Sequence, residues 1–229
     1  MASNNDKALK PSQRMRIAYL LAMVGGYLDA YTYFMRGGVF ANAQTGNIVK
    51  FGIALADGAS DTYLRFLLPI GTFALGLLCS LAIEEILERR GIRLVRRTVL
   101  AVEALGLVIV AIIPLEDQWN TCANCVVSFL AAMQYETFTT FRGDAIVTTM
   151  STGNLRKMVD ALFAGSVRGK RGEFARAGRY LSIIMTFAFG AFLGAKCCDV
   201  LRRSAVLPAV LMLVVAIGII TFLRNHRNA

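Results

Sequence analysis

Two acidic side chains, Asp29 and Glu136, lie inside apolar stretches, and each is followed three residues later by a threonine, Thr32 or Thr139. Residues three apart on a helix share a face, so we expect each acid to lie beside its threonine. A carboxylate at the centre of a bilayer costs at least ~2.5 kcal/mol on insertion scales, and it faces protein or water. Two interpretations stay open: a proton or cation relay that lines a polar path, or a static pair with a neighbouring lysine.

A second polar motif also occurs twice. Thr45-Gly46-Asn47 recurs as Thr152-Gly153-Asn154, and a lysine follows each copy one helical turn later, at Lys50 and Lys157. The threonine or asparagine could cap a helix, and the glycine permits close backbone approach. The free N–H groups of a helix start suit an anion or a carbonyl oxygen. The motif predicts a site for a small anion or carboxylate-bearing solute, or else a well-capped packing turn.

These pairs belong to a longer internal repeat. Residues 28–56 align without a gap with residues 135–163, and eight of the 29 aligned positions are identical. A second match, between residues 72–76 and 186–190, indicates a seven-residue insertion in the basic, glycine-rich stretch near 164–176. The chain therefore reads as two copies of one unit.

The composition places the chain in a membrane. It is 56% hydrophobic and 17% charged, whereas soluble domains carry about 25% charge. The net charge of +10 does not indicate a nucleic-acid partner, because the basic residues lie in short loops beside apolar runs, where they set topology.

Charge placement selects the topology. The apolar segments are 15–36, 44–57, 63–88, 98–115, 119–141, 149–164, 176–200 and 205–223. The two that begin near the T-G-N motifs are too short for the roughly 30 Å hydrocarbon core. If those two are re-entrant or broken helices, six crossings remain, and sixteen Lys and Arg residues of the N-tail, the 89–97 and 165–179 loops and the C-tail all become cytoplasmic.

The predicted fold class is thus all-α: a polytopic membrane protein with about six transmembrane helices, two short re-entrant or broken helices and two repeats. Its parts are an N-tail (1–13), repeat 1 (14–115), repeat 2 (116–223) and a basic C-tail (224–229). Because each repeat has an odd number of crossings, the second is inverted relative to the first. Gly190 and Gly194, matched by Gly76 and Ser80, predict close helix packing between the repeats or in a homodimer.

Several classes of protein find no support. The five cysteines form no disulfide framework, and the C-x-x-C at Cys122 and Cys125 has no second pair or nearby histidine to complete a metal site. No nucleophile-elbow, P-loop or dinucleotide fingerprint is present. We expect no enzymatic activity, no cofactor and no metal.

The runs Gly26-Tyr-Leu-Asp-Ala-Tyr-Thr-Tyr-Phe34 and Gly37-Gly-Val-Phe-Ala-Asn-Ala-Gln-Thr-Gly-Asn-Ile48 resemble the signature of the YoaK-type membrane proteins, a bacterial family of unknown function. The resemblance covers nearly the whole chain. It implies an inner-membrane location and says nothing firm about substrate.

The repeat predicts a small permease or channel that moves a small polar solute or ion through a midplane site between two inverted repeats. Asp29 and Glu136 are its candidate coupling acids. The alternative is a non-transporting assembly or sensor protein whose repeats are purely structural. Expected partners are the lipid bilayer, the solute and a second copy of the chain. The expected location is a bacterial inner membrane, with both termini in the cytoplasm.

Overall fold

The protein folds as an array of helices. The computed structural model describes residues 14–58, 60–90 and 95–228, so the N-tail at 1–13 and part of the 89–97 loop lie outside the described residues. Within these ranges the six long helices are α1 (Met15–Met35), α3 (Ser60–Arg89), α4 (Val95–Ile112), α5 (Asp117–Thr137), α7 (Gly172–Leu201) and α8 (Leu207–Asn228). The two short helices are α2 (Gln44–Ala56) and α6 (Thr152–Ser166). The predicted all-α fold class is confirmed, whereas the six membrane crossings and the two re-entrant helices stay a prediction.

The helices pack across the two halves of the sequence. Helix α1 packs against α7, and α5 packs against α3, so the first helix of each half contacts the third helix of the other half. The short helices lie along α3 and α7, α2 on the former and α6 on the latter, and α4 packs against α8. Exchanging the two halves of the chain leaves this set of neighbours unchanged.

Glycines permit the closest of these contacts. A Cβ atom added at Gly190 would lie 2.1 Å from the backbone oxygen of Met23, and one at Gly194 would lie 2.6 Å from that of Tyr27. In the other half, a Cβ at Gly76 would lie 2.4 Å from the oxygen of Phe129. Close packing between the halves, predicted from these small residues, is confirmed.

The outer surface of the helices is strongly apolar. Large exposed side chains include Leu78, Leu105, Met185, Leu211 and Phe222. Among the described residues, two stretches are long and apolar enough to cross a membrane: Thr62–Arg89, within α3, and Gly172–Asn225, which runs through α7, the short 3-10 helix η3 (Arg202–Val206) and most of α8. Only 22% and 28% of their most apolar windows are buried inside the protein, unlike the core helices of a soluble domain. Exposed apolar surface of this extent marks a membrane or protein interface.

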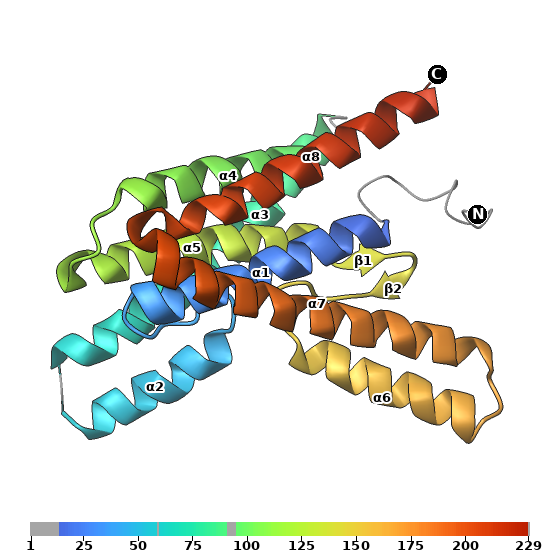
Figure 1. Cartoon of the computed structure of the whole chain (residues 1–229), viewed down its shortest axis with the longest axis horizontal. Helices are drawn as coiled ribbons and strands as arrows, with labels where there is room; N and C mark the ends of the chain where they lie inside the picture. Colours follow the sequence, from blue (N-terminus) through green and yellow to red (C-terminus); the bar gives the residue numbers. More distant parts are fainter. Residues whose placement is uncertain (1–13, 59, 91–94, 229) are drawn as a thin grey trace.

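The short helices diverge from the middle of the molecule (Figure 1). Helices α2 and α6 both begin near the centre of the long axis and run towards opposite ends. The connections that follow α2 and α4 lie at one end of that axis. The start of α1, the connection between α6 and α7 and the end of α8 lie at the other.

One predicted helix is shorter than expected. The segment 119–141 was expected to be helical throughout, but α5 ends at Thr137, and a hairpin of β1 (Thr140–Phe141) and β2 (Asp144–Ala145) follows. Threonine and aromatic residues from 137 to 141 favour extended backbone. Arg142 and Gly143 both have positive φ, as a two-residue hairpin turn requires. Thr139 therefore does not share a helix face with Glu136, and that prediction was wrong.

Candidate functional site

A groove of about 570 Å³ lies where α2 and α6 begin. Its lining comes from α1, α2, α7, the first residue of α6 and the segments leading into α2 and α6: Asp29, Ala30, Tyr33, Phe34, Phe40, Ala43, Thr45, Gly46, Thr149, Met150, Ser151, Thr152, Phe187 and Ala191. Both T-G-N motifs thus contribute to one groove, although they are 107 residues apart in the sequence. Asp29, Thr45, Gly46 and Thr152 are the predicted site residues that the fold brings together here.

Helix α1 holds the two approaching segments against itself at Gly25. The side-chain amide of Asn42 donates to the Gly25 backbone oxygen at 2.7 Å. On the other side, a Cβ at Gly25 would lie 2.9 Å from the Thr148 backbone oxygen. The missing side chain lets both segments reach the same point of α1, which places the starts of α2 and α6 beside one groove.

Asp29 and Thr32 fix the segment that leads into α2. Asp29 Oδ1 accepts a hydrogen bond of 2.9 Å from the backbone N–H of Asn42. Thr32 Oγ1 donates to the backbone oxygen of Leu28 at 3.0 Å and accepts from the N–H of Ala41 at 3.3 Å. Both side chains are buried. No ion pair to Asp29 is present among the described residues, so the static pair with a lysine is not found.

The two asparagines of the T-G-N motifs have the same structural role. Asn47 Oδ1 accepts from the backbone N–H of Phe40, and its Nδ2 donates to the oxygen of the same residue. Asn154 makes both bonds to Val147, also seven residues earlier. Neither side chain caps its helix, and no side-chain cap bond is found for α2 or α6. The predicted capping role of Thr45 or Asn47 was wrong, because the asparagine instead bonds the extended segment before the helix.

The two lysines also have matching contacts. Lys50 donates to the backbone oxygen of Gly38, and Lys157 donates to that of Ala145 at 2.6 Å, each twelve residues earlier. The Lys50 ammonium also lies over the rings of Tyr33 and Phe40, at 5.0 and 4.9 Å from their centroids. Neither lysine lines the groove.

The remaining predicted residues lie outside the groove. Glu136 is half-buried and Thr139 is exposed, and neither is among the lining residues. Gly153 is exposed, and a Cβ added there would meet nothing within 4 Å. The two acids that match in the sequence therefore occupy different environments, and only Asp29 reaches the groove.

Sequence reasoning missed a groove residue, Thr149. This side chain is fully buried, and its hydroxyl has no hydrogen-bond partner. A buried polar atom without a partner is rare in folded proteins and requires an explanation, such as a ligand or a water. Thr149 aligns with Asn42 in the repeat, so the only sequence signal was a polar residue at the same position of both copies.

Arg36 was also missed, although it is the largest fully buried side chain. Its guanidinium donates to the backbone oxygens of Val110, Ile113 and Pro114 at the end of α4, and its Nε donates to the Tyr31 hydroxyl at 3.0 Å. The last carbonyls of a helix lack the usual intrahelical partner, and here Val110 also accepts from the Ile113 N–H at 3.3 Å, while Ile113 and Pro114 follow the last residue of α4. Arg36 thus joins the end of α1 to the end of α4 and stabilises the framework behind the groove.

The chemistry of the lining favours a cation. The lining residues include one acid, Asp29, and the hydroxyl-bearing residues Thr45, Thr149, Ser151 and Thr152, among apolar and aromatic residues. No lysine, arginine or histidine is among the described residues that line it. A buried carboxylate attracts positive charge, and the rings of Phe34 and Phe187, which Lys50 does not cover, add to that attraction. This lining does not support the anion site expected from the helix starts.

Fold and site together define an all-α protein with exposed apolar helices, two stretches of membrane-spanning length and one apolar groove holding a carboxylate. The profile of DUF1275, a family described as proteins of unknown function, matches residues 17–219, and the chain belongs to this family. That membership is compatible with the resemblance to YoaK-type proteins. Comparison with curated proteins and with solved structures gave no match.

Proposed function

We propose that the protein is a small membrane permease or channel that moves a small cation through the groove between α2 and α6. In this proposal six helices cross a bacterial inner membrane, α2 and α6 enter it part-way, and the two halves are inverted repeats. Both chain ends lie in the cytoplasm. Two observations support this arrangement. The set of helix contacts stays the same when the two halves are exchanged, and α2 and α6 both begin near the centre of the molecule (Figure 1).

One observation carries the proposal. The starts of the two repeated short helices meet at one groove that contains a buried carboxylate without a counter-ion among the described residues. An ionisable residue inside a membrane protein marks an ion or substrate path by default. Thr149, whose buried hydroxyl has no hydrogen-bond partner, lies in the lining of the same groove.

The direct test is charge movement in proteoliposomes on a solid support. Guanidinium, tetramethylammonium, Na⁺ and K⁺ are the cation probes, and acetate and phosphate are the anion probes. We expect a current with at least one cation and none with the anions. Asp29→Asn should lower that current about tenfold or more, because a hydrogen bond to a charged group contributes about 1.5–3 kcal/mol. Glu136→Gln, outside the groove, is the matched control and should retain most of it.

The outcome separates the two classes of function. Loss of current with Asp29→Asn but not with Glu136→Gln supports transport through the groove. Absence of current with every probe contradicts transport and favours the assembly or sensor protein. Equal loss in both variants contradicts the assignment of the path to the groove.

A further inference from the structure

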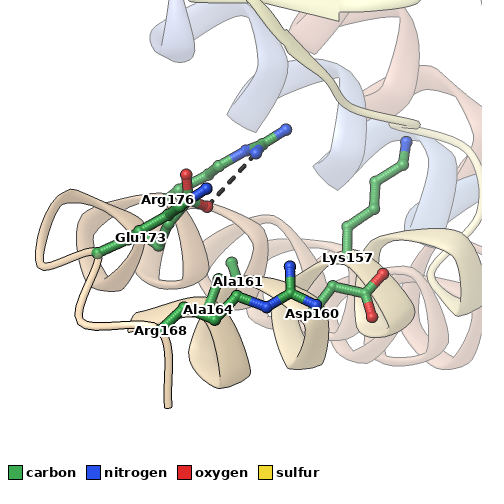
Figure 2. A pocket seen from close by; sticks show the side chains of 8 residues that line it. Lys157, Asp160, Ala161, Ala164, Arg168, Glu173 and Arg176 are labelled. Carbon is green, nitrogen blue, oxygen red and sulfur yellow. Dashed lines mark hydrogen bonds and ion pairs between the residues drawn. The ribbon is translucent and has the colours of Figure 1, made fainter. Parts of the chain in front are cut away.

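A second hollow, lined mainly by basic side chains, lies between α6 and α7. Its volume is about 290 Å³, and it lies away from the groove, towards the end of α6 and the start of α7. Figure 2 shows lining side chains from both helices facing the same space. The lining residues are Lys157, Asp160, Ala161, Ala164, Arg168, Lys170, Glu173 and Arg176. Four are basic and two are acidic, which leaves an excess of positive charge.

The two acids do not neutralise Arg168 or Lys170, because each acid lies beside a different arginine. Glu173 Oε2 is 3.4 Å from Arg176 Nη1, as the dashed line in Figure 2 marks. Asp160 Oδ2 is 3.9 Å from Arg156 Nε, which is outside the lining. Arg168 and Lys170 have no carboxylate within ion-pair distance among the described residues. These two cations are available to a bound anion.

The wall on α7 is held in place. Asp144, buried behind the hollow, lies 2.9 Å from Arg176 Nε and 2.7 Å from Arg179 Nη2. On α6, the Lys157 ammonium is held by the Ala145 backbone oxygen at 2.6 Å. The hairpin thus anchors one lining basic residue on each helix, Lys157 on α6 and Arg176 on α7. A small preformed site results, with fixed cations behind and two unpaired cations at its edge.

Apolar side chains surround the basic hollow. Phe163, Val167 and Phe174 are 52%, 66% and 46% exposed, and the Arg168 guanidinium lies 5.6 Å from the Phe163 ring centroid. A site for a free phosphate ion does not require exposed apolar neighbours. A phospholipid does, because its acyl chains extend from the headgroup along the protein surface.

The hollow belongs to only one half of the molecule. Its loop contains the seven-residue insertion inferred from the repeat, and the corresponding connection after α2 carries the acidic Asp57 instead. Anionic lipids are found in the cytoplasmic leaflet, and basic pockets between helices on that side bind their headgroups. The difference in charge between the two connections is the one expected for opposite membrane faces.

We propose that this hollow binds the phosphate-bearing headgroup of an anionic phospholipid in the cytoplasmic leaflet. Arg168 and Lys170 contact the phosphate, and Phe163, Val167 and Phe174 lie along the acyl chains. The proposal needs the chain to lie in a membrane but does not need it to transport a solute. A negative transport assay therefore leaves it intact, and a negative lipid assay leaves transport intact.

The experiment is native mass spectrometry of the full-length chain in a neutral detergent, titrated with phosphatidylglycerol or phosphatidylcholine. We expect retained phosphatidylglycerol, little phosphatidylcholine, and an affinity for the former about tenfold weaker in Arg168→Gln/Lys170→Gln, since each cation near the headgroup contributes to binding. The control, Lys196→Gln/Arg202→Gln, removes the same charge from exposed positions at the other end of α7 and should bind like the wild type.

Three results would overturn the proposal. The first is equal retention of the two lipids, and the second is equal weakening in the control variant. The third is competition by millimolar inorganic phosphate, which would show that free phosphate is the ligand. Thermal unfolding without lipid checks that both double variants fold like the wild type.

Discussion

At the scale of single residues, the repeated motif acts mainly on its own backbone. Asn47 and Asn154 each pair with the N–H and C=O of a residue seven positions earlier, and Lys50 and Lys157 each bind a carbonyl twelve positions earlier. These bonds tie the start of each short helix to the segment before it. Conventional capping would leave that segment free to move, whereas this arrangement fixes the groove wall.

We predict that Asn154→Ala lowers the free energy of unfolding by about 1–3 kcal/mol, because it leaves the polar backbone groups of Val147 without their partner. Thermal unfolding in detergent measures this difference. Asn225→Ala, at an exposed position of α8, is the control and should change stability by less than about 0.5 kcal/mol. Equal effects in the two variants would show that the bidentate contact contributes nothing.

The residue scale also shows how much of the site the sequence could reveal. Asp29 and the T-G-N threonines were recognised because a polar residue in an apolar run, occurring twice, stands out. Thr149 and Arg36 were not, since their importance depends on burial and on carbonyls about 75 residues away in the chain. The helix starts and the two lysines led to the expectation of an anion site, and only the packing shows that neither lysine lines the groove.

At the scale of elements, the length of the apolar segments and the placement of charge predicted nearly all the helices. Each long segment is rich in apolar residues and is bounded by polar loops. The hairpin after α5 was missed, since five residues of high β-propensity at the end of an apolar run extend its hydropathy without extending the helix. The repeat gave no sign of the hairpin. The matching segment of the first half forms no strands and instead has Gly37 and Gly38 at positive φ.

The contact between α1 and α7 yields a prediction for the glycines that form it. Gly190→Ala should destabilise the protein by about 1–3 kcal/mol, because the new Cβ would meet the backbone of Met23, which cannot move aside. Gly218→Ala, inside α8 with open space around it, should be neutral or stabilise by about 0.5–1 kcal/mol. Chemical or thermal unfolding of the two variants checks the contrast. Similar stabilities would contradict the close packing.

At the scale of the whole molecule, the first helix of each half packs against a helix of the other half. Neither half therefore packs into a complete bundle without the other. The connection after α2 and the one after α6 lie at opposite ends of the long axis (Figure 1). They carry opposite charge, with Asp57 at one and Arg168, Lys170 and Arg171 at the other. In an inverted repeat, equivalent loops face opposite sides of the membrane.

The topology can be measured with single cysteines in a background lacking the five native ones, all of which are free thiols. Asp57→Cys and Arg168→Cys are exposed positions in equivalent connections. We predict that a membrane-impermeant maleimide added to intact cells labels the first and not the second, which reacts only after lysis. Labelling of both from outside would exclude the inverted arrangement.

The central claim is that the starts of α2 and α6 meet at a water-accessible path inside the membrane. Its most direct test is thiol accessibility of Thr45→Cys and Thr152→Cys in proteoliposomes, with Leu105→Cys on the exposed apolar face of α4 as the lipid-facing control. We predict that a small, impermeant cationic methanethiosulfonate modifies both groove cysteines, that guanidinium slows the reaction, and that the control stays unmodified. Groove cysteines as unreactive as Leu105→Cys would contradict the account.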